Sequence, residues 1–187
     1  MRLKHLIRDT RGTVTMEFVL TFPLVISWIF LSFTMFDAYR SSSHTSKAVY
    51  TIADNLSRKE FLDTTYLEDM YTLLDNLLPF SPDDKWMRMT SVTFDEEEDE
   101  YLVDWSYIAK PDGDPTPEHT DETLPLELLP TIQDADSVLL IEVNVPYDPV
   151  AATVPFLETL GFDALVWEAR SIVRPRFIAR VVCTDCA

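Results

Sequence analysis

Residues 18–36 read FVLTFPLVISWIFLSFTMF, nineteen consecutive residues without a charged side chain. A helix of this length extends about 28 Å, close to the thickness of the hydrocarbon core of a bilayer. A helix in a soluble core would carry a polar stripe at helical spacing. The hydroxylated residues here can all hydrogen-bond to their own helix, and they are Thr21, Ser27, Ser32 and Thr34. The stretch therefore predicts a membrane-spanning helix, kinked near its start at Pro23.

The flanks of this stretch predict its orientation. Four cations and a single acid precede Gly12. By the positive-inside rule the N-terminus is expected in the cytoplasm and the 151 residues after Phe36 outside, which is the periplasm if the source is a Gram-negative bacterium. A cleavable secretory signal is the weaker alternative. The apolar stretch is longer than the usual 7–15 residues or so, and no small-x-small cleavage site follows it.

Composition restricts the function classes. The chain of 187 residues has 15 Lys and Arg against 32 Asp and Glu, a net charge of −17. This balance argues against a nucleic-acid partner, because phosphate contacts need a cationic face. Only three glycines are present, and no phosphate-binding loop motif occurs. A hydrophobic content of 47% is too high for a disordered acidic chain, so the outer part is expected to fold.

The outer part begins with two predicted helices. Apolar residues recur at helical spacing through residues 45–60, which extends the membrane helix outward. Thr65-x-x-Glu68 matches a capping box for a second helix, which Pro79 ends. The apolar face expected for this second helix consists of Leu67, Met70, Tyr71, Leu74, Leu77 and Leu78.

Strand patterns follow the helices. Residues 87–94, 101–107 and 139–145 are β-prone or alternate between apolar and polar side chains, with Glu142 and Asn144 on the polar side. A last pair is expected at 166–173 and 177–182, broken by Pro175. Residues 110–123 read as a polar loop that includes His119, and 149–161 as a short capped helix. The fold class is therefore α+β, with helices packed on an antiparallel sheet of about four strands.

A glycine and an acid precede the apolar stretch in a specific order. Residues 11–18 read RGTVTMEF, so that Glu17 and Phe18 follow Gly12 at the edge of the predicted membrane helix. A carboxylate costs of order 3 kcal/mol at the centre of a membrane helix and less near its end. One interpretation places Glu17 at the headgroups, where its cost is small. The other is that Glu17 finds a charged partner.

This arrangement resembles the processing site of type IV pilins and pseudopilins. The wider stretch RGTVTMEFVLTFPLV resembles the TadE/TadF-like minor pilins of the tight-adherence (Tad, Flp or type IVb) pilus, and IVRPR at 172–176 is similar to their closing segment. The resemblance covers residues 8–40 and 165–178. It implies a cytoplasmic leader at 1–12, an assembly helix at 13–60 with the membrane span at 18–36, and a periplasmic domain at 61–187.

The resemblance also implies partners. A prepilin peptidase would cut between Gly12 and Thr13, and Glu17 would then pair with the new N-terminal amine of a neighbouring subunit. The expected partners are this peptidase, other pilins or pseudopilins, the Tad assembly platform and the inner membrane, with possible incorporation in the pilus and a role in its assembly or in adhesion. Major pilins of this system are very short, so the long outer part favours a minor pilin. No cofactor is expected.

Two further groups are candidate sites. Asp95, Glu96, Glu97, Glu98, Asp99 and Glu100 form an acidic run that offers oxygen ligands for calcium, although an exposed hairpin tip is the commoner outcome. Asp112-Gly113-Asp114 is a similar, weaker case. Cys183 and Cys186 form a CxxC motif for which three alternatives stay open: a local disulfide, free thiols, or metal or intermolecular pairing.

No catalytic motif is evident, and the chain is not expected to be an enzyme. His44 lies in a predicted helix, His119 in a loop, and no nucleophile elbow or HExxH occurs. Arg174 and Arg176 are expected to orient the last strands or to pair with acidic groups. Besides the minor pilin, two alternatives remain: a membrane-anchored periplasmic binding or scaffold protein without a pilus role, and a tethered enzyme with a deep pocket.

Overall fold

The computed structural model describes residues 13–79, 81–97, 99–110, 116–133, 136–147 and 165–186. Gly12, Glu98, residues 112–114 and the helix expected at 149–161 lie outside these residues. The helices are α2 (Thr13–Ser57) and α3 (Thr64–Leu77), with short 3₁₀ turns η2 (Asp121–Thr123) and η3 (Leu126–Leu128). The strands are β1 (Phe61–Leu62), β2 (Trp86–Asp95), β3 (Glu100–Ala109), β4 (Ser137–Tyr147), β5 (Leu165–Val173) and β6 (Val182–Cys183).

The chain divides into two compact units. The first consists of Met1–Tyr39 and Pro149–Asp163, of which the structure describes the N-terminal part of α2. The second consists of Arg40–Asp148 and Ala164–Ala187, and it contains all the strands. The α+β class, the long apolar N-terminal helix and the antiparallel sheet of four strands are confirmed.

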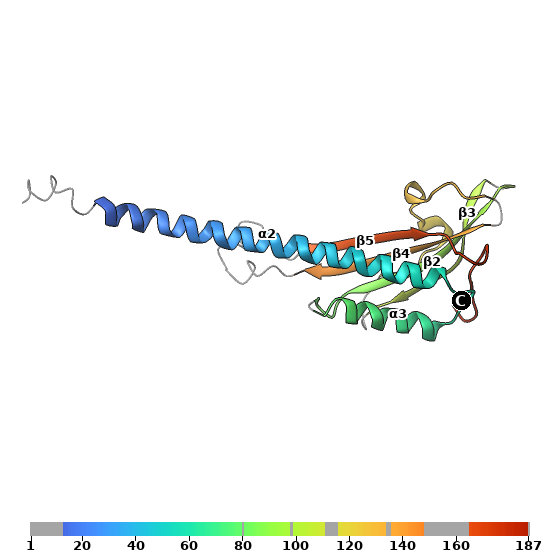
Figure 1. The fold of residues 1–187 in the computed structure, drawn as a ribbon. Helices are drawn as coiled ribbons and strands as arrows, with labels where there is room; N and C mark the ends of the chain where they lie inside the picture. The colour runs from blue at the N-terminus through green and yellow to red at the C-terminus, as the bar shows by residue number, and fades with distance from the viewer. Residues whose placement is uncertain are drawn as a thin grey trace, which may run out of the picture. The chain divides into compact units, whose positions relative to one another are not determined.

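The main sheet has the strand order β3-β2-β4-β5, and every neighbouring pair is antiparallel (Figure 1). β2 and β4 pair along most of their length, with Met89 opposite Ile141. The register of β2 with β3 shifts between Ser91 and Val92, where Asp104 is the extra residue. In a bulge of this kind two successive side chains turn to the same face, and here they belong to Asp104 and Trp105.

One face of the sheet forms the main hydrophobic core with the helices. Odd-numbered residues of β2 and β4 supply the sheet side because side chains alternate along a strand. In α2, Ala48, Val49, Ile52, Ala53 and Leu56 form a buried stripe at helical spacing. α3 adds Leu67, Met70 and Leu74. Figure 1 shows α3 and the C-terminal part of α2 lying along the strands of the second unit.

The predicted capping box at the start of α3 is wrong. The helix begins at Thr64, one residue before the predicted cap, and its N-cap is Asp63, whose carboxylate accepts a hydrogen bond from the backbone N–H of Tyr66 at 2.7 Å. Asp63 is the N-cap because its extended backbone lets the short carboxylate reach the third N–H of the helix. The helix ends before Pro79 as predicted, but Leu77 on its expected apolar face is exposed.

The strand expected at 177–182 is also wrong. β5 ends at Val173, and the chain then runs without regular structure to β6, which comprises only Val182 and Cys183. β6 does not join the main sheet. It pairs in parallel with β1, with Phe61 opposite Val182 and Leu62 opposite Cys183. Pro175 cannot donate to a strand ladder, which agrees with the end of β5 near this position.

Candidate functional site

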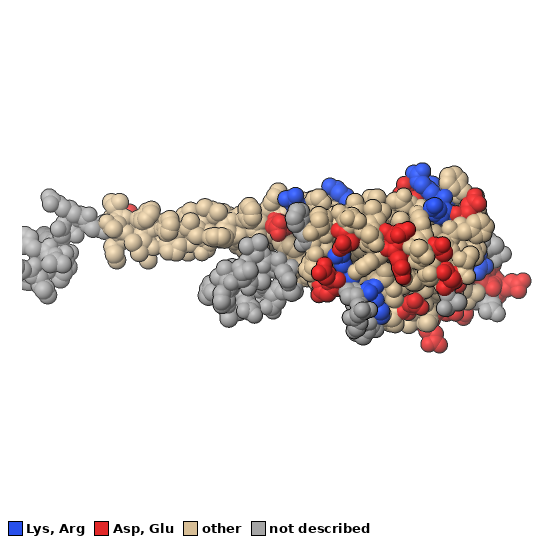
Figure 2. Space-filling model, turned by 90° about the horizontal axis from the view of Figure 1, so that it is seen from below, with Lys and Arg blue, Asp and Glu red and all other residues tan. Residues whose placement is uncertain are grey.

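The N-terminal part of α2 exposes almost all of its apolar side chains. Between residues 14 and 36, every large apolar side chain except Ile26 is exposed, with exposed fractions from 41% at Leu31 to 74% at Val14. Figure 2 shows this part of the helix with almost only uncharged side chains. Within the described residues, this is the one helix long and apolar enough to span a membrane. Thr21 and Thr34 donate hydrogen bonds to the carbonyl oxygens of Glu17 and Phe30, as the sequence predicts.

The predicted processing residues lie at the beginning of this helix. Thr13 is the first residue of α2, and the helix continues through Pro23 as one element. Glu17 is exposed, and its carboxylate has no ion pair or hydrogen bond within the part of the chain that the structure describes. Phe18 packs against Phe22 one turn later, with ring centroids 5.3 Å apart. Four residues from the helix start, the carboxylate therefore points outward from a helix that is apolar on all sides.

A buried polar network lies on the face of the sheet opposite the helices. Its centre is Glu142 on β4, whose side chain is 6% exposed. Arg88 on β2 donates to Glu142 Oε2 from Nε at 2.8 Å and from a terminal nitrogen at 2.5 Å. Nε2 of His119 lies 2.7 Å from the same oxygen. Nε of Arg170 on β5 lies 3.2 Å from Oε1.

Electrostatics decide the protonation state at Glu142. Burial by itself raises the pKa of this carboxyl, but the hydrogen bonds from His119 and Arg88, together with the charge of Arg88, lower it below its usual value of 4.5. Glu142 is therefore ionised at neutral pH and can only accept hydrogen bonds. It follows that Nε2 of His119 carries the proton in their contact.

This network holds the segment 116–133 on the sheet. The backbone N–H of His119 donates to Ser106 Oγ at 3.0 Å, and Arg88 donates to the carbonyl of Pro117 at 2.9 Å. A second apolar cluster covers the same face and contains Val92, Leu124, Ile132 and Val138. From the sequence, Glu142 is expected on the polar side of an alternating strand and His119 in a loop. Both side chains are buried, because this segment covers them.

The bulge in β3 creates a second buried carboxylate. Asp104 accepts hydrogen bonds from the hydroxyls of Ser91 and Thr93, both at 3.2 Å, and forms an ion pair with Arg180. Burial raises the pKa of Asp104, and the charge of Arg180 and the hydroxyl hydrogen bonds only partly offset this effect. The sequence contains no signal for this site because it depends on the shift in register.

Residues 174–186, here called the C-terminal segment, cross several elements of the second unit. The backbone N–H of Arg176 donates to the carbonyl of Ser57 at the end of α2 at 2.8 Å, and its guanidinium pairs with Asp54. Arg174 lies 4.0 Å from Asp136. Both arginines therefore pair with acidic groups, which is one of the two roles expected for them. A cation at a helix C-terminus also interacts favourably with the helix dipole.

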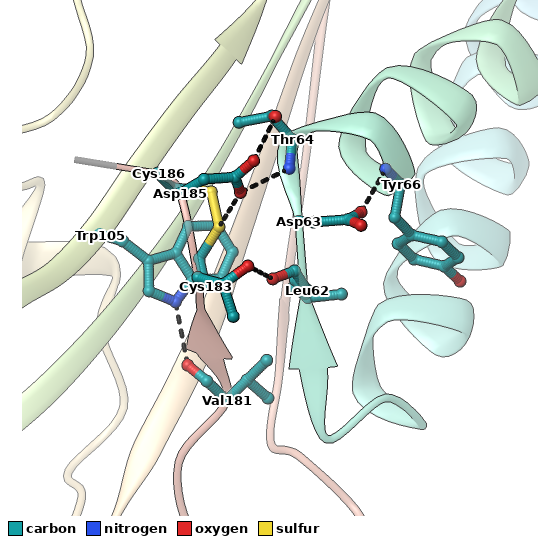
Figure 3. Close-up of a disulfide and its surroundings, with 10 residues drawn as sticks. Leu62, Asp63, Thr64, Tyr66, Trp105, Val181, Cys183, Asp185 and Cys186 are labelled. Atoms are coloured by element: carbon teal, nitrogen blue, oxygen red, sulfur yellow. Dashed lines mark hydrogen bonds between the residues drawn. A yellow bond between two sulfur atoms is a disulfide. The ribbon is translucent and has the colours of Figure 1, made fainter.

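The C-terminal segment ends in a disulfide between Cys183 and Cys186, whose Cα atoms are 5.5 Å apart. Upstream of it, the Trp105 indole N–H donates to the carbonyl of Val181 at 2.9 Å. Asp185, between the cysteines, accepts hydrogen bonds from the backbone N–H and the hydroxyl of Thr64 at 2.9 and 2.8 Å. Figure 3 shows Asp185 pointing toward Thr64 while Asp63 points toward Tyr66. Two carboxylates thus cap the first turn of α3.

The acidic run forms the turn between β2 and β3. The backbone N–H of Glu97 donates to Asp95 Oδ1 at 2.9 Å, and Asp99 adopts a positive φ of 57°. Among the described residues, the donor atoms of this run do not converge on a common point as metal ligands would. In the described part of the chain, the one group that converges is Cys183, Asp185 and Cys186, and its two sulfurs are bonded to each other.

Comparison of the chain with models of protein families, with curated proteins and with solved structures gave no match.

Proposed function

We propose that the chain is a minor pilin or pseudopilin of a tight-adherence (Tad, Flp or type IVb) pilus, processed after Gly12 and anchored in the inner membrane before assembly. The observation that carries this proposal is the beginning of α2. Thr13 starts the helix, and Glu17 presents an exposed carboxylate with no partner among the described residues, next to a long apolar surface.

The chemistry of processing would provide that partner. Hydrolysis of the bond between Gly12 and Thr13 leaves an amine at the first residue of α2. Paired with Glu17 of a neighbouring subunit, this amine would offset the cost of keeping the carboxylate beside hydrocarbon. The exposed apolar side chains that contact lipid before assembly would then contact the helices of sister subunits. The N-terminus would lie in the cytoplasm and the second unit in the periplasm.

The test is the mature N-terminus of the protein purified from its native membrane. We expect mass spectrometry to show a chain that begins at Thr13. Gly12→Leu should abolish cleavage, because the bulky side chain replaces the glycine next to the cut bond, whereas the matched change Thr10→Leu should not. A native chain that keeps Met1 while pili form normally would overturn the proposal.

A second measurement separates pilus assembly from simple anchoring. Glu17→Gln keeps the shape of the side chain but removes its charge, so it should leave cleavage intact and reduce recovery of the protein in sheared pili by about tenfold or more, the loss expected for one buried ion pair. Normal recovery of this variant would favour the membrane-anchored binding or scaffold protein.

A further inference from the structure

Residues 183–186 form a small closed ring within the second unit. Cys183 and Cys186 are joined three positions apart, and Cys183 also belongs to β6. From inside this ring, Thr184 donates to the carbonyl of Leu62 on β1 from its backbone N–H at 3.0 Å and from its hydroxyl at 3.3 Å. Asp185 caps α3 at Thr64. All the polar contacts of the ring therefore reach β1 and the start of α3.

We propose that the Cys183–Cys186 disulfide is a redox latch that holds residues 183–186 on β1 and the start of α3. In the locked form the ring presents Asp185 to the first turn of α3. In the reduced form the four residues regain their backbone freedom, Asp185 leaves Thr64, and Thr184 leaves Leu62.

The chemistry of locking needs an oxidant. The two thiols lose two electrons and two protons as the S–S bond forms, and a disulfide of a thiol–disulfide oxidant accepts them and becomes a dithiol. Such oxidants act in the periplasm and not in a reducing cytosol. The latch would therefore close only where the environment is oxidising, after the C-terminus has left the cytosol.

The C-terminal segment before the ring has contacts of its own. Val181 is fully buried, and Ser137 donates to the carbonyl of Ala179 from its backbone N–H and its hydroxyl, both at 2.9 Å. The ring itself has few other contacts, since β6 pairs with β1 over only two residues. Thr184 and Asp185 are exposed and the cysteines half-buried, which allows a small reductant to reach the sulfur atoms. In the chain-entropy model, closing a loop of this size reduces the number of conformations open to the unfolded segment by about a factor of ten.

Limited proteolysis of the full-length protein in detergent tests the latch. Trypsin can cut after Arg176 and Arg180 in the C-terminal segment. With a metal chelator present, we expect a phosphine reductant to accelerate the cut after Arg180, which is the nearer to the ring, about tenfold. The cut after Arg176, whose backbone N–H is bonded to Ser57, should change less. The cut after Lys85, whose side chain is only 2% exposed, reports unfolding of the whole second unit and should remain slow. The double variant Cys183→Ser/Cys186→Ser should behave like the reduced protein without any reductant.

Asp185→Asn provides the matched control for the cap. It keeps the disulfide but weakens the bonds to Thr64, so it should accelerate the cuts less than reduction does. Equal cleavage rates with and without the reductant would overturn the proposal. A parallel increase at Lys85 would do the same, since reduction would then unfold the unit. If added Zn²⁺ protected the reduced protein from cleavage, the latch would be wrong, and Cys183, Asp185 and Cys186 would instead form a metal site. None of these outcomes depends on cleavage after Gly12, so the latch and the pilin proposal fail separately.

Discussion

The two parts of α2 bury their side chains in different ways. From residue 14 to 36, apolar side chains surround the helix and stay exposed, whereas from 45 to 57 they form a stripe that is fully buried under the sheet. One continuous helix thus has two different environments. The difference shows that the spacing of apolar residues, and not helix propensity, decides what a helix packs against. An apolar stripe needs one partner, while an apolar surface on all sides needs apolar surroundings on all sides.

The largest expected effect comes from truncating a core side chain in the C-terminal part of α2. Ile52 has no exposed surface, so Ile52→Ala should lower the free energy of unfolding of the second unit by about 3 kcal/mol through the lost burial and the cavity left behind. Ile29→Ala is the matched change in the N-terminal part and should alter it by less than about 0.5 kcal/mol. Thermal unfolding of the detergent-solubilised protein measures both. Equal losses would show that the two parts share one core.

The next effect compares two glutamates. Glu142→Gln leaves Arg88 buried without its counter-charge and should cost about 3 kcal/mol at pH 7. Because the pKa of Glu142 is lowered, its ionised form stabilises the fold above pH 4.5, and this contribution is lost as the pH falls through the folded-state pKa. Below pH 4.5, the free energy of unfolding should therefore decrease less steeply with falling pH in the variant than in the wild type.

Glu17→Gln is the control for this prediction. Its carboxylate is exposed and has no partner among the described residues, so unfolding of the second unit should be unchanged across the same pH range. If Glu142→Gln had the same unfolding midpoint as the wild type at pH 7, the buried network would not hold segment 116–133 on the sheet.

The smallest effect concerns hydrogen bonds at two helical positions. Asp63→Ala removes the N-cap of α3 and should cost about 1 kcal/mol. Thr21→Val removes only a hydroxyl that bonds to its own helix and should leave the second unit unchanged. Chemical denaturation followed by tryptophan fluorescence is precise enough for both. An unchanged Asp63→Ala variant would assign the capping of α3 to Asp185 alone.

The sequence predicts those parts of the fold whose residues repeat locally. Alternation located β3 and β4, and the uncharged stretch located the exposed part of α2. A β-prone composition located β2, and β5 was expected as one strand of a last pair. The buried network was missed because Glu142 fits the alternation of a half-exposed strand, and only the distant segment around His119 covers it. The pairing of β6 with β1 was also missed, because a stretch of two residues is too short to show a periodic pattern.

The same distinction between local and distant information applies to the candidate sites. Glu17 and Phe18 were predicted as processing residues from their order along the chain, which needs no tertiary information. The role of Asp185 could not be predicted, because a carboxylate between two cysteines looks like any other until its position beside Thr64 is known. The bulge that turns Asp104 inward likewise has no local signature, since it is a property of the pairing between two strands.

The pairing of β1 with β6 joins parts of the chain that are synthesised far apart in time. Asp185, the second carboxylate at the start of α3, follows Thr64 by 121 positions, so it reaches the helix only after the strands of the main sheet have been synthesised. At ribosomal speeds of about 5–20 residues per second, this delay is roughly 10 s. During that interval Asp63 is the carboxylate that caps the helix.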